Sequence, residues 1–184
     1  MNTYPMRVAV ALLLGLMAMP AVAQSLIGIN QVFNRQVSLV NLVLRFDAAT
    51  ACNSGRAFYK RFPDGTLATE EFTVPDPGAL VITDFRWSAI PTPAAFASNA
   101  ILQAVLQSRL DGGLISTIYT SSAINLTPDF STMNRIAGSD TINSGIGVGS
   151  GRTLCVFAES KTVSFTAFHT VASAEINGYI LKKR

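Results

Sequence analysis

The sequence predicts an all-β protein, a two-sheet antiparallel sandwich of jelly-roll type with one disulfide. Three observations support this fold class. Val, Ile, Thr, Phe and Ser are frequent after the N-terminal region, a composition typical of strands. Gly, Pro, Asn and Asp interrupt the chain at short spacing, as turns require. About eight to ten short segments of strand character lie between these turns, which favours a sandwich or jelly roll.

The N-terminus has the order of a secretory signal peptide. Arg7 is the only charge before an apolar run at residues 8–19, and small residues then precede a predicted cleavage between Ala23 and Gln24. The run is shorter than the roughly 20 residues that span a bilayer, so an uncleaved anchor is the less favoured alternative. We expect a bacterial signal peptide at residues 1–23. Residues 24–184 would form a single secreted or periplasmic domain with no membrane span after processing.

Two cysteines, Cys52 and Cys155, both follow the predicted leader. An even number of cysteines in an exported chain favours a disulfide, because the compartment is oxidising. Two buried free thiols are the alternative. A disulfide between these positions would close a long loop, which the chain-entropy model associates with a large stabilisation.

The first half of the expected domain contains segments of strand composition that end at turns: residues 38–46, 56–62, 69–74 and 79–89. In the last of these, Val81, Phe85 and Trp87 share one face and polar residues share the other. A strand predicts this period-two division. Trp87 is therefore expected in the core.

Residues 94–110 fit two structures. Asp111 and Gly112 lie between the runs 101–110 and 114–121, and Asp-Gly between such runs indicates a hairpin. However, residues 94–110 are rich in Ala and their apolar residues have helical spacing. We favour the hairpin because the second run is clearly of strand type.

The second half contains a loop-rich region at residues 125–151, with one short strand at most. Three strands follow: residues 152–159, 162–171 and 174–182. The glycine-dense stretch 145–151 could suggest a phosphate-binding loop, but such a loop needs a helix after it. Since a strand follows here, we predict a flexible turn that leads into that strand.

Residues that could carry chemistry are sparse. His169 is the only histidine, so a metal site or a serine–histidine hydrolase has few candidates. We expect His169 to be half-buried in a strand and satisfied by a neighbour. Glu70 and Glu71 are adjacent, so on a strand they would point to opposite faces and could not act as a carboxylate pair. The sequence therefore predicts no catalytic residue, no metal and no cofactor.

The charge pattern indicates few kinds of partner. The formal net charge is +3, and the basic residues are scattered apart from a cluster at residues 182–184. A nucleic-acid-binding surface would need a basic face, so we expect no such partner. Charged residues make up only 14% of the chain, below the usual share of about 25%. This deficit makes a homo-oligomer plausible.

Four segments resemble a pattern in small exported bacterial β-sandwich proteins, a family that is largely uncharacterised. These segments are Glu71-Phe72-Thr73-Val74-Pro75, Leu80-Val81-Ile82-Thr83-Asp84-Phe85-Arg86-Trp87, Gly149-Ser150-Gly151-Arg152-Thr153-Leu154 and Ile176-Asn177-Gly178-Tyr179-Ile180-Leu181. Together they cover less than half of the expected mature chain. The resemblance implies the fold and export but no activity.

Three functions remain open at this point. The leading hypothesis is an exported, non-enzymatic structural or surface-interaction protein whose partner is unknown, with a cell-surface or glycan partner conceivable. The first alternative is a carbohydrate-binding module that uses Tyr59, Tyr119 and Tyr179, if these are exposed in a row. The second is a carboxylate-based hydrolase, which needs two acids in one cleft.

Overall fold

The alternating segments of the sequence become the strands of a computed structural model, which describes residues 37–45, 52, 55–97, 99–110, 113–127 and 135–182. The predicted leader, with its cleavage between Ala23 and Gln24, lies outside the described residues, as do Asp111 and Gly112. The elements are β1 (Val37–Leu44), β2 (Arg56–Arg61), β3 (Gly78–Ile90), α3 (Pro93–Ala97), β4 (Ile101–Leu110), β5 (Ile115–Thr120), β6 (Ile124–Asn125), β7 (Ile136–Gly149), β8 (Arg152–Lys161) and β9 (Thr166–Lys182). The predicted all-β class is confirmed.

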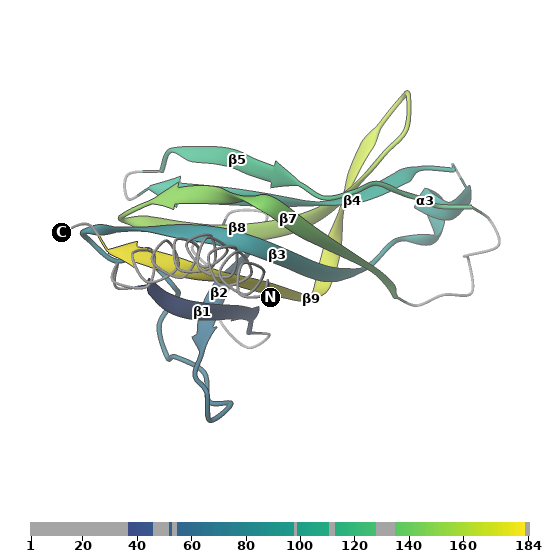
Figure 1. Cartoon of the computed structure of the whole chain (residues 1–184). Coiled ribbons are helices and arrows are strands. Elements are labelled where there is room, and N and C mark those ends of the chain that lie inside the picture. Colours follow the sequence, from purple (N-terminus) through teal and green to yellow (C-terminus); the bar gives the residue numbers. More distant parts are fainter. Residues whose placement is uncertain are drawn as a thin grey trace, which may run out of the picture. The chain divides into compact units, whose positions relative to one another are not determined.

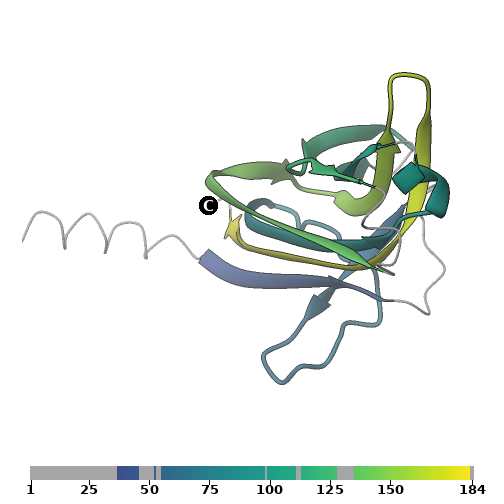
Figure 2. The same ribbon diagram turned by 90° about the vertical axis from the view of Figure 1, so that its right-hand side faces the viewer.

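All nine strands belong to one hydrogen-bonded antiparallel sheet. Its order is β5-β4-β8-β2-β1-β9-β3-β7, with β6 paired to β4 and β8 also paired to β9. The expectation of two sheets therefore needs a qualification, because β2 and β9 connect the two halves into one sheet (Figures 1 and 2). The two halves enclose one core, to which every strand from β1 to β4 and from β7 to β9 contributes buried side chains.

The two edges of this sheet meet through side chains. Ser122, which follows β5, donates its backbone N–H and its hydroxyl to the carboxylate of Asp140 on β7. The hydroxyl-to-carboxylate distance is 2.5 Å. On the inner side, Tyr119 of β5 packs edge-on against Phe85 of β3. A polar contact thus joins the segment after β5 to β7, and an aromatic contact joins β5 to β3.

The predicted loop-rich region at residues 125–151 is wrong in its main part, because β7 is a 14-residue strand. β7 pairs with β3 over most of its length. Its glycines, Asp140 and Asn143 have low intrinsic strand preference, and the partner strand overrides that preference. The turn is confined to Ser150 and Gly151, where Gly151 has a φ of 70° that favours glycine.

Three further segments differ from the sequence predictions. Residues 69–74 do not form a strand and contribute only an isolated bridge at Thr73. The strands predicted at 162–171 and 174–182 are one 17-residue strand, β9, whose register against β3 shifts beside Ala172. The ambiguous stretch 94–110 contains both a short helix, α3, and a strand, β4. The favoured hairpin is confirmed, since β4 pairs antiparallel with β5.

The predicted disulfide is confirmed. Cys52 and Cys155 are bonded, with 103 residues between them in sequence and 5.9 Å between their Cα atoms. The bond joins the segment before β2 to β8, next to the place where these two strands pair. Gly55 permits this approach, because a Cβ atom there would lie 2.8 Å from the carbonyl oxygen of Val156.

Among the residues that the structure describes, no helix has the length and apolar character needed to cross a bilayer.

Candidate functional site

The last strand carries a row of polar side chains on its outer face. Because side chains alternate along a strand, Ile176 and Ile180 enter the core while their neighbours face outward. The outward side chains form what we call the β9 row: Ser173, Glu175, Asn177 and Tyr179. Every member of the row lines at least one of two neighbouring hollows, and both hollows share Arg61 and Glu175. The β9 row is the common floor of this candidate site.

The first hollow has a volume of about 710 Å³, and we call it the amide hollow. Its polar and aromatic lining comprises Asn41, Lys60, Phe62, Thr83, Asn177 and Tyr179. Thr83 faces outward because it follows the buried Ile82, and the register shift of the β3–β9 pair then lies between Ile82 and Asp84. Its hydroxyl donates to the carbonyl of Asn177, which fixes the strand beneath the hollow.

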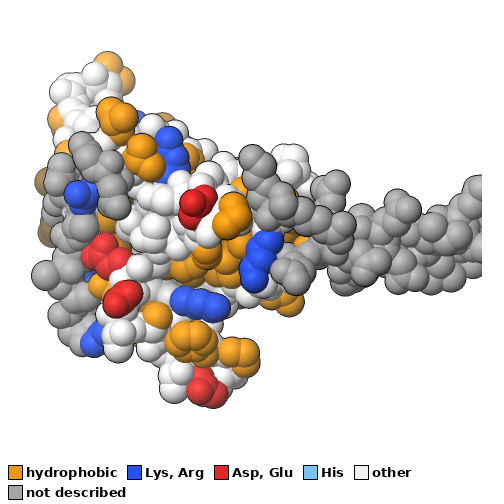
Figure 3. Space-filling view, turned by 90° about the vertical axis from the view of Figure 1, so that its left-hand side faces the viewer, with side chains coloured by type: hydrophobic (Ala, Val, Ile, Leu, Met, Phe, Trp, Pro, Cys, Tyr) orange, Lys and Arg blue, Asp and Glu red, His pale blue; other side chains and the backbone are white. Residues whose placement is uncertain are grey.

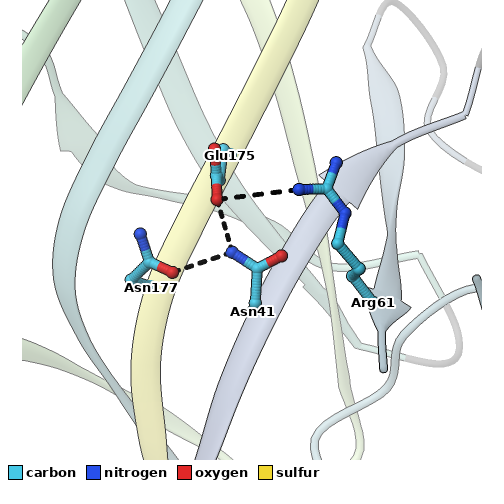
Figure 4. A network of polar contacts seen from close by, with 4 residues as sticks. All are labelled: Asn41, Arg61, Glu175 and Asn177. Carbon is cyan, nitrogen blue, oxygen red and sulfur yellow. Dashed lines mark hydrogen bonds and ion pairs between the residues drawn. The ribbon is translucent and has the colours of Figure 1, made fainter. Parts of the chain in front are cut away.

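A polar network holds the centre of the two hollows (Figure 4). The side-chain NH₂ of Asn41 on β1 donates to the carboxylate of Glu175 at 2.5 Å and to the side-chain oxygen of Asn177 at 2.8 Å. Arg61 on β2 lies 4.0 Å from the same carboxylate oxygen of Glu175. An ionised carboxylate can only accept, so Asn41 must present its NH₂ group here. Its carbonyl oxygen Oδ1 is buried and has no hydrogen-bond partner among the described residues.

The second hollow has a volume of about 650 Å³, and we call it the arginine hollow. Its charged lining is Arg61, Arg86, Arg135 and Glu175. Arg86 faces Glu175 across the β3–β9 pair. Among the described residues, Glu175 is the only acid that lines either of these hollows.

Two serines position Arg135 at the end of the arginine hollow. Its Nε donates to the hydroxyl of Ser88 at 2.7 Å, and one terminal NH₂ group donates to the hydroxyl of Ser173 at 2.6 Å. The two hydroxyls are also hydrogen-bonded to each other at 2.8 Å. Ser88 is buried. The guanidinium is thus oriented by neutral groups, and its positive charge is not cancelled by them.

The tyrosines proposed as ligand-binding residues do not form a row. Tyr59 is only 3% exposed, so its ring cannot serve as an open platform. Tyr119 is half-buried on the far side of the core, and burial followed by the charge of Asp140 raises its pKa. Only Tyr179 lines one of the two hollows. Trp87 is 2% exposed, which confirms its predicted place in the core.

His169 and Ser160 form a buried pair that resembles half of a hydrolytic site. The His169 Nε2 atom lies 2.6 Å from the hydroxyl of Ser160, which agrees with the expectation of a histidine satisfied by a neighbour. Ser160 is 0% exposed and His169 is 8% exposed, so a substrate could not reach the hydroxyl. Burial lowers the pKa of His169. This pair is therefore part of the packing and not of the candidate site.

Glu159 is held by partners that are not acids. Glu159 is buried, accepts a hydrogen bond from Gln103 at 2.9 Å and pairs with Lys161 at 2.6 Å. Within the described part of the chain, no three His, Cys, Asp or Glu side chains are grouped closely enough to hold a metal ion. The polar groove is thus lined by amides, hydroxyls, guanidinium groups, the ammonium group of Lys60 and one carboxylate.

Sequence analysis missed most of this groove. The arginines come from three separate segments, and only the folded sheet brings them together. One local signal was present, since the alternation of residues 173–180 places Ser173, Glu175, Asn177 and Tyr179 on one face. The chain matches no known family model and no curated protein.

Proposed function

We propose that the chain is an exported, non-enzymatic interaction protein that binds its ligand in the groove above the β9 row. The observation that carries this proposal is the half-used network around Asn41. Its NH₂ group is fixed by Glu175 and Asn177, while its buried Oδ1 has no partner among the described residues. A buried acceptor without a donor is costly, so the Asn41 side chain would gain by shifting on binding to accept a hydrogen bond from a ligand hydroxyl.

Carbohydrate is the class of ligand that this groove favours. Sugars present both hydroxyl groups and apolar ring faces, and binding sites for such ligands combine a few placed polar groups with aromatic side chains. The amide hollow offers this combination, since Tyr179 and Phe62 line it together with Asn41 and Asn177. A carboxylate-based hydrolase has weaker support, because the hydrolase needs two acids and the groove is lined by one.

Two features support export. The N-terminal sequence has the order of a signal peptide, and the Cys52–Cys155 disulfide fits an oxidising compartment. The resemblance to exported bacterial β-sandwich proteins points the same way. The face seen in Figure 3 carries basic and acidic side chains scattered among hydrophobic and uncharged ones, so it is not a single-sign surface.

A glycan array with protein 24–184 tests the proposal. We expect binding to a defined subset of glycans, and we expect Asn177→Ala to weaken it by about 3- to 10-fold, the range for one neutral hydrogen bond. Asn143→Ala is the matched control, because Asn143 is exposed on β7 and lines neither hollow. Thermal melting of each variant checks that the fold is retained.

Two outcomes would contradict the proposal. One is an array without any glycan that the protein binds. The other is binding that Asn177→Ala and Asn143→Ala affect equally, which would place the ligand outside the groove.

A further inference from the structure

The arginine hollow has an excess of positive charge that the described residues do not neutralise. Three guanidinium groups, those of Arg61, Arg86 and Arg135, line it with one carboxylate, that of Glu175. Arginine stays protonated at any physiological pH, so the hollow is positive whatever the conditions. Glu175 is already engaged by Asn41 and lies 4.0 Å from Arg61. Arg86 and Arg135 therefore have no carboxylate of their own among the described residues.

Arg135 is held in one orientation without losing its charge. The hydroxyls of Ser88 and Ser173 use its Nε and one terminal NH₂ group. A guanidinium carries five N–H groups, so further donors remain for a ligand. Since Ser88 is buried, it fixes the guanidinium before any ligand arrives. Such preorganisation lowers the entropy lost on binding.

The ring of Trp87 also lines the arginine hollow. Trp87 is 2% exposed, and its indole nitrogen has no hydrogen-bond partner among the described residues. The edge of the ring that carries this nitrogen faces Gly138, which lines the same hollow. The hollow is thus bounded by the positive edge of an aromatic ring as well as by arginines, and its lining favours an anion.

We infer that the arginine hollow binds a carboxylate group, and that the ligand of the groove is an acidic saccharide. This inference rests on the proposed function, because it assigns the sugar ring to the amide hollow and its carboxylate to the arginine hollow. The two hollows share Arg61 and Glu175, so one ligand can occupy both. Arginine and carboxylate form paired, charge-assisted hydrogen bonds, which are stronger than neutral ones.

The test compares acidic glycans with uncharged versions of the same glycans. The array contains uronic-acid, sialylated and sulfated glycans beside their neutral counterparts, and the best uronic-acid oligosaccharide is then titrated by calorimetry against its methyl ester. We expect the acid to bind about 10- to 100-fold more tightly than the ester. We also expect added salt to reduce this preference by screening.

Variants assign the preference to the hollow. Arg86→Gln should remove most of the difference between acid and ester while binding of the ester persists. Lys182→Gln removes one positive charge from an exposed site that lines neither hollow, and it should leave the difference unchanged. Melting temperatures confirm that both variants are folded.

The outcomes separate this inference from the proposed function. If neutral glycans bind in an Asn177-dependent manner and the acid has no advantage, the carboxylate assignment is overturned and the groove remains a carbohydrate site. Preference for sulfated over uronic-acid glycans also overturns the assignment to a carboxylate. If no glycan binds, both fail. If Arg86→Gln and Lys182→Gln reduce acid binding equally, the effect comes from net charge and not from the hollow.

Discussion

His169, which the sequence placed in a strand beside a neighbouring partner, shows how burial changes the chemistry of a side chain. It lies on β9 and contacts the hydroxyl of Ser160 through Nε2, while its Nδ1 is buried without a hydrogen-bond partner among the described residues. Loss of water disfavours the charged imidazolium, so burial lowers the pKa of His169 from its ordinary value of 6.5. The residue is neutral near pH 7.

This shift predicts a pH-dependent stability. Below pH 6.5 the unfolded chain binds a proton at His169 more readily than the folded chain does. The free energy of unfolding should therefore fall as the pH falls below 6.5, by up to about 1.4 kcal/mol per pH unit from this residue. Above that pH the contribution is complete. Chemical denaturation between pH 7.5 and 5 measures the effect.

His169→Gln serves as the comparison for that experiment, because glutamine does not titrate. The variant should be less stable than the parent chain at pH 7.5, where the Ser160 contact is lost, but its stability should fall less between pH 7 and 5. Parallel pH profiles for the two proteins would show that His169 does not cause the dependence.

At the scale of the elements, the pairing of β3 with β7 depends on one glycine. A Cβ atom at Gly138 would lie 2.6 Å from the indole nitrogen of Trp87. Trp87 is buried in the core and has little room to move. The edge strand β7 therefore leaves the space that the largest side chain of β3 occupies.

Substitution of this glycine tests the arrangement. Gly138→Ala should reduce the free energy of unfolding by about 1–3 kcal/mol, the usual cost of inserting an atom into a packed core. Gly147→Ala is the matched control in the same strand, since no atom lies within 4 Å of its Cβ position. Urea denaturation of both variants gives the comparison. Equal stability of the two variants would mean that Trp87 can move aside.

The strands that the sequence predicted are those whose own residues show the alternation typical of a strand. Residues 79–89 alternate, and β3 occupies them, but a register shift between Ile82 and Asp84 interrupts the alternation. Phe85 and Trp87 therefore enter the core together with Leu80 and Ile82, and the prediction that Val81 shares their face is wrong, because Val81 pairs with the outward-facing Tyr179. β7 was missed because its side chains are small and polar, and its strand conformation comes from pairing with β3, which lies far away in sequence. The break predicted near residue 172 is a change of register inside β9, and such a bulge has no distinctive residue here.

At the scale of the whole molecule, the candidate site also has one part that the local sequence predicts and one part that depends on residues far apart in the chain. The β9 row could be read from local alternation, whereas the arginine hollow could not. Arg61 lies on β2, Arg86 on β3 and Arg135 directly before β7. They become neighbours only because the sheet has the order β2-β1-β9-β3-β7, with β1 and β3 on either side of β9. Sequence order predicts neither this arrangement nor the network around Asn41, which joins residues more than 130 positions apart.

The disulfide connects these distant parts and yields the last prediction. It closes a loop of 103 residues that contains β2 to β7, so it restricts the unfolded chain far more than a short loop would. The double variant Cys52→Ala/Cys155→Ala should therefore lose about 2–5 kcal/mol of unfolding free energy. Reductant should destabilise the parent chain by a similar amount and leave the variant unchanged.

Since β2 is held to β8 by only a short ladder at Arg56 and Ala57, loss of the disulfide should also raise amide hydrogen exchange first in β2. An unchanged exchange rate there would show that the ladders with β8 and β1 suffice to keep β2, and with it Arg61, in place beneath the groove.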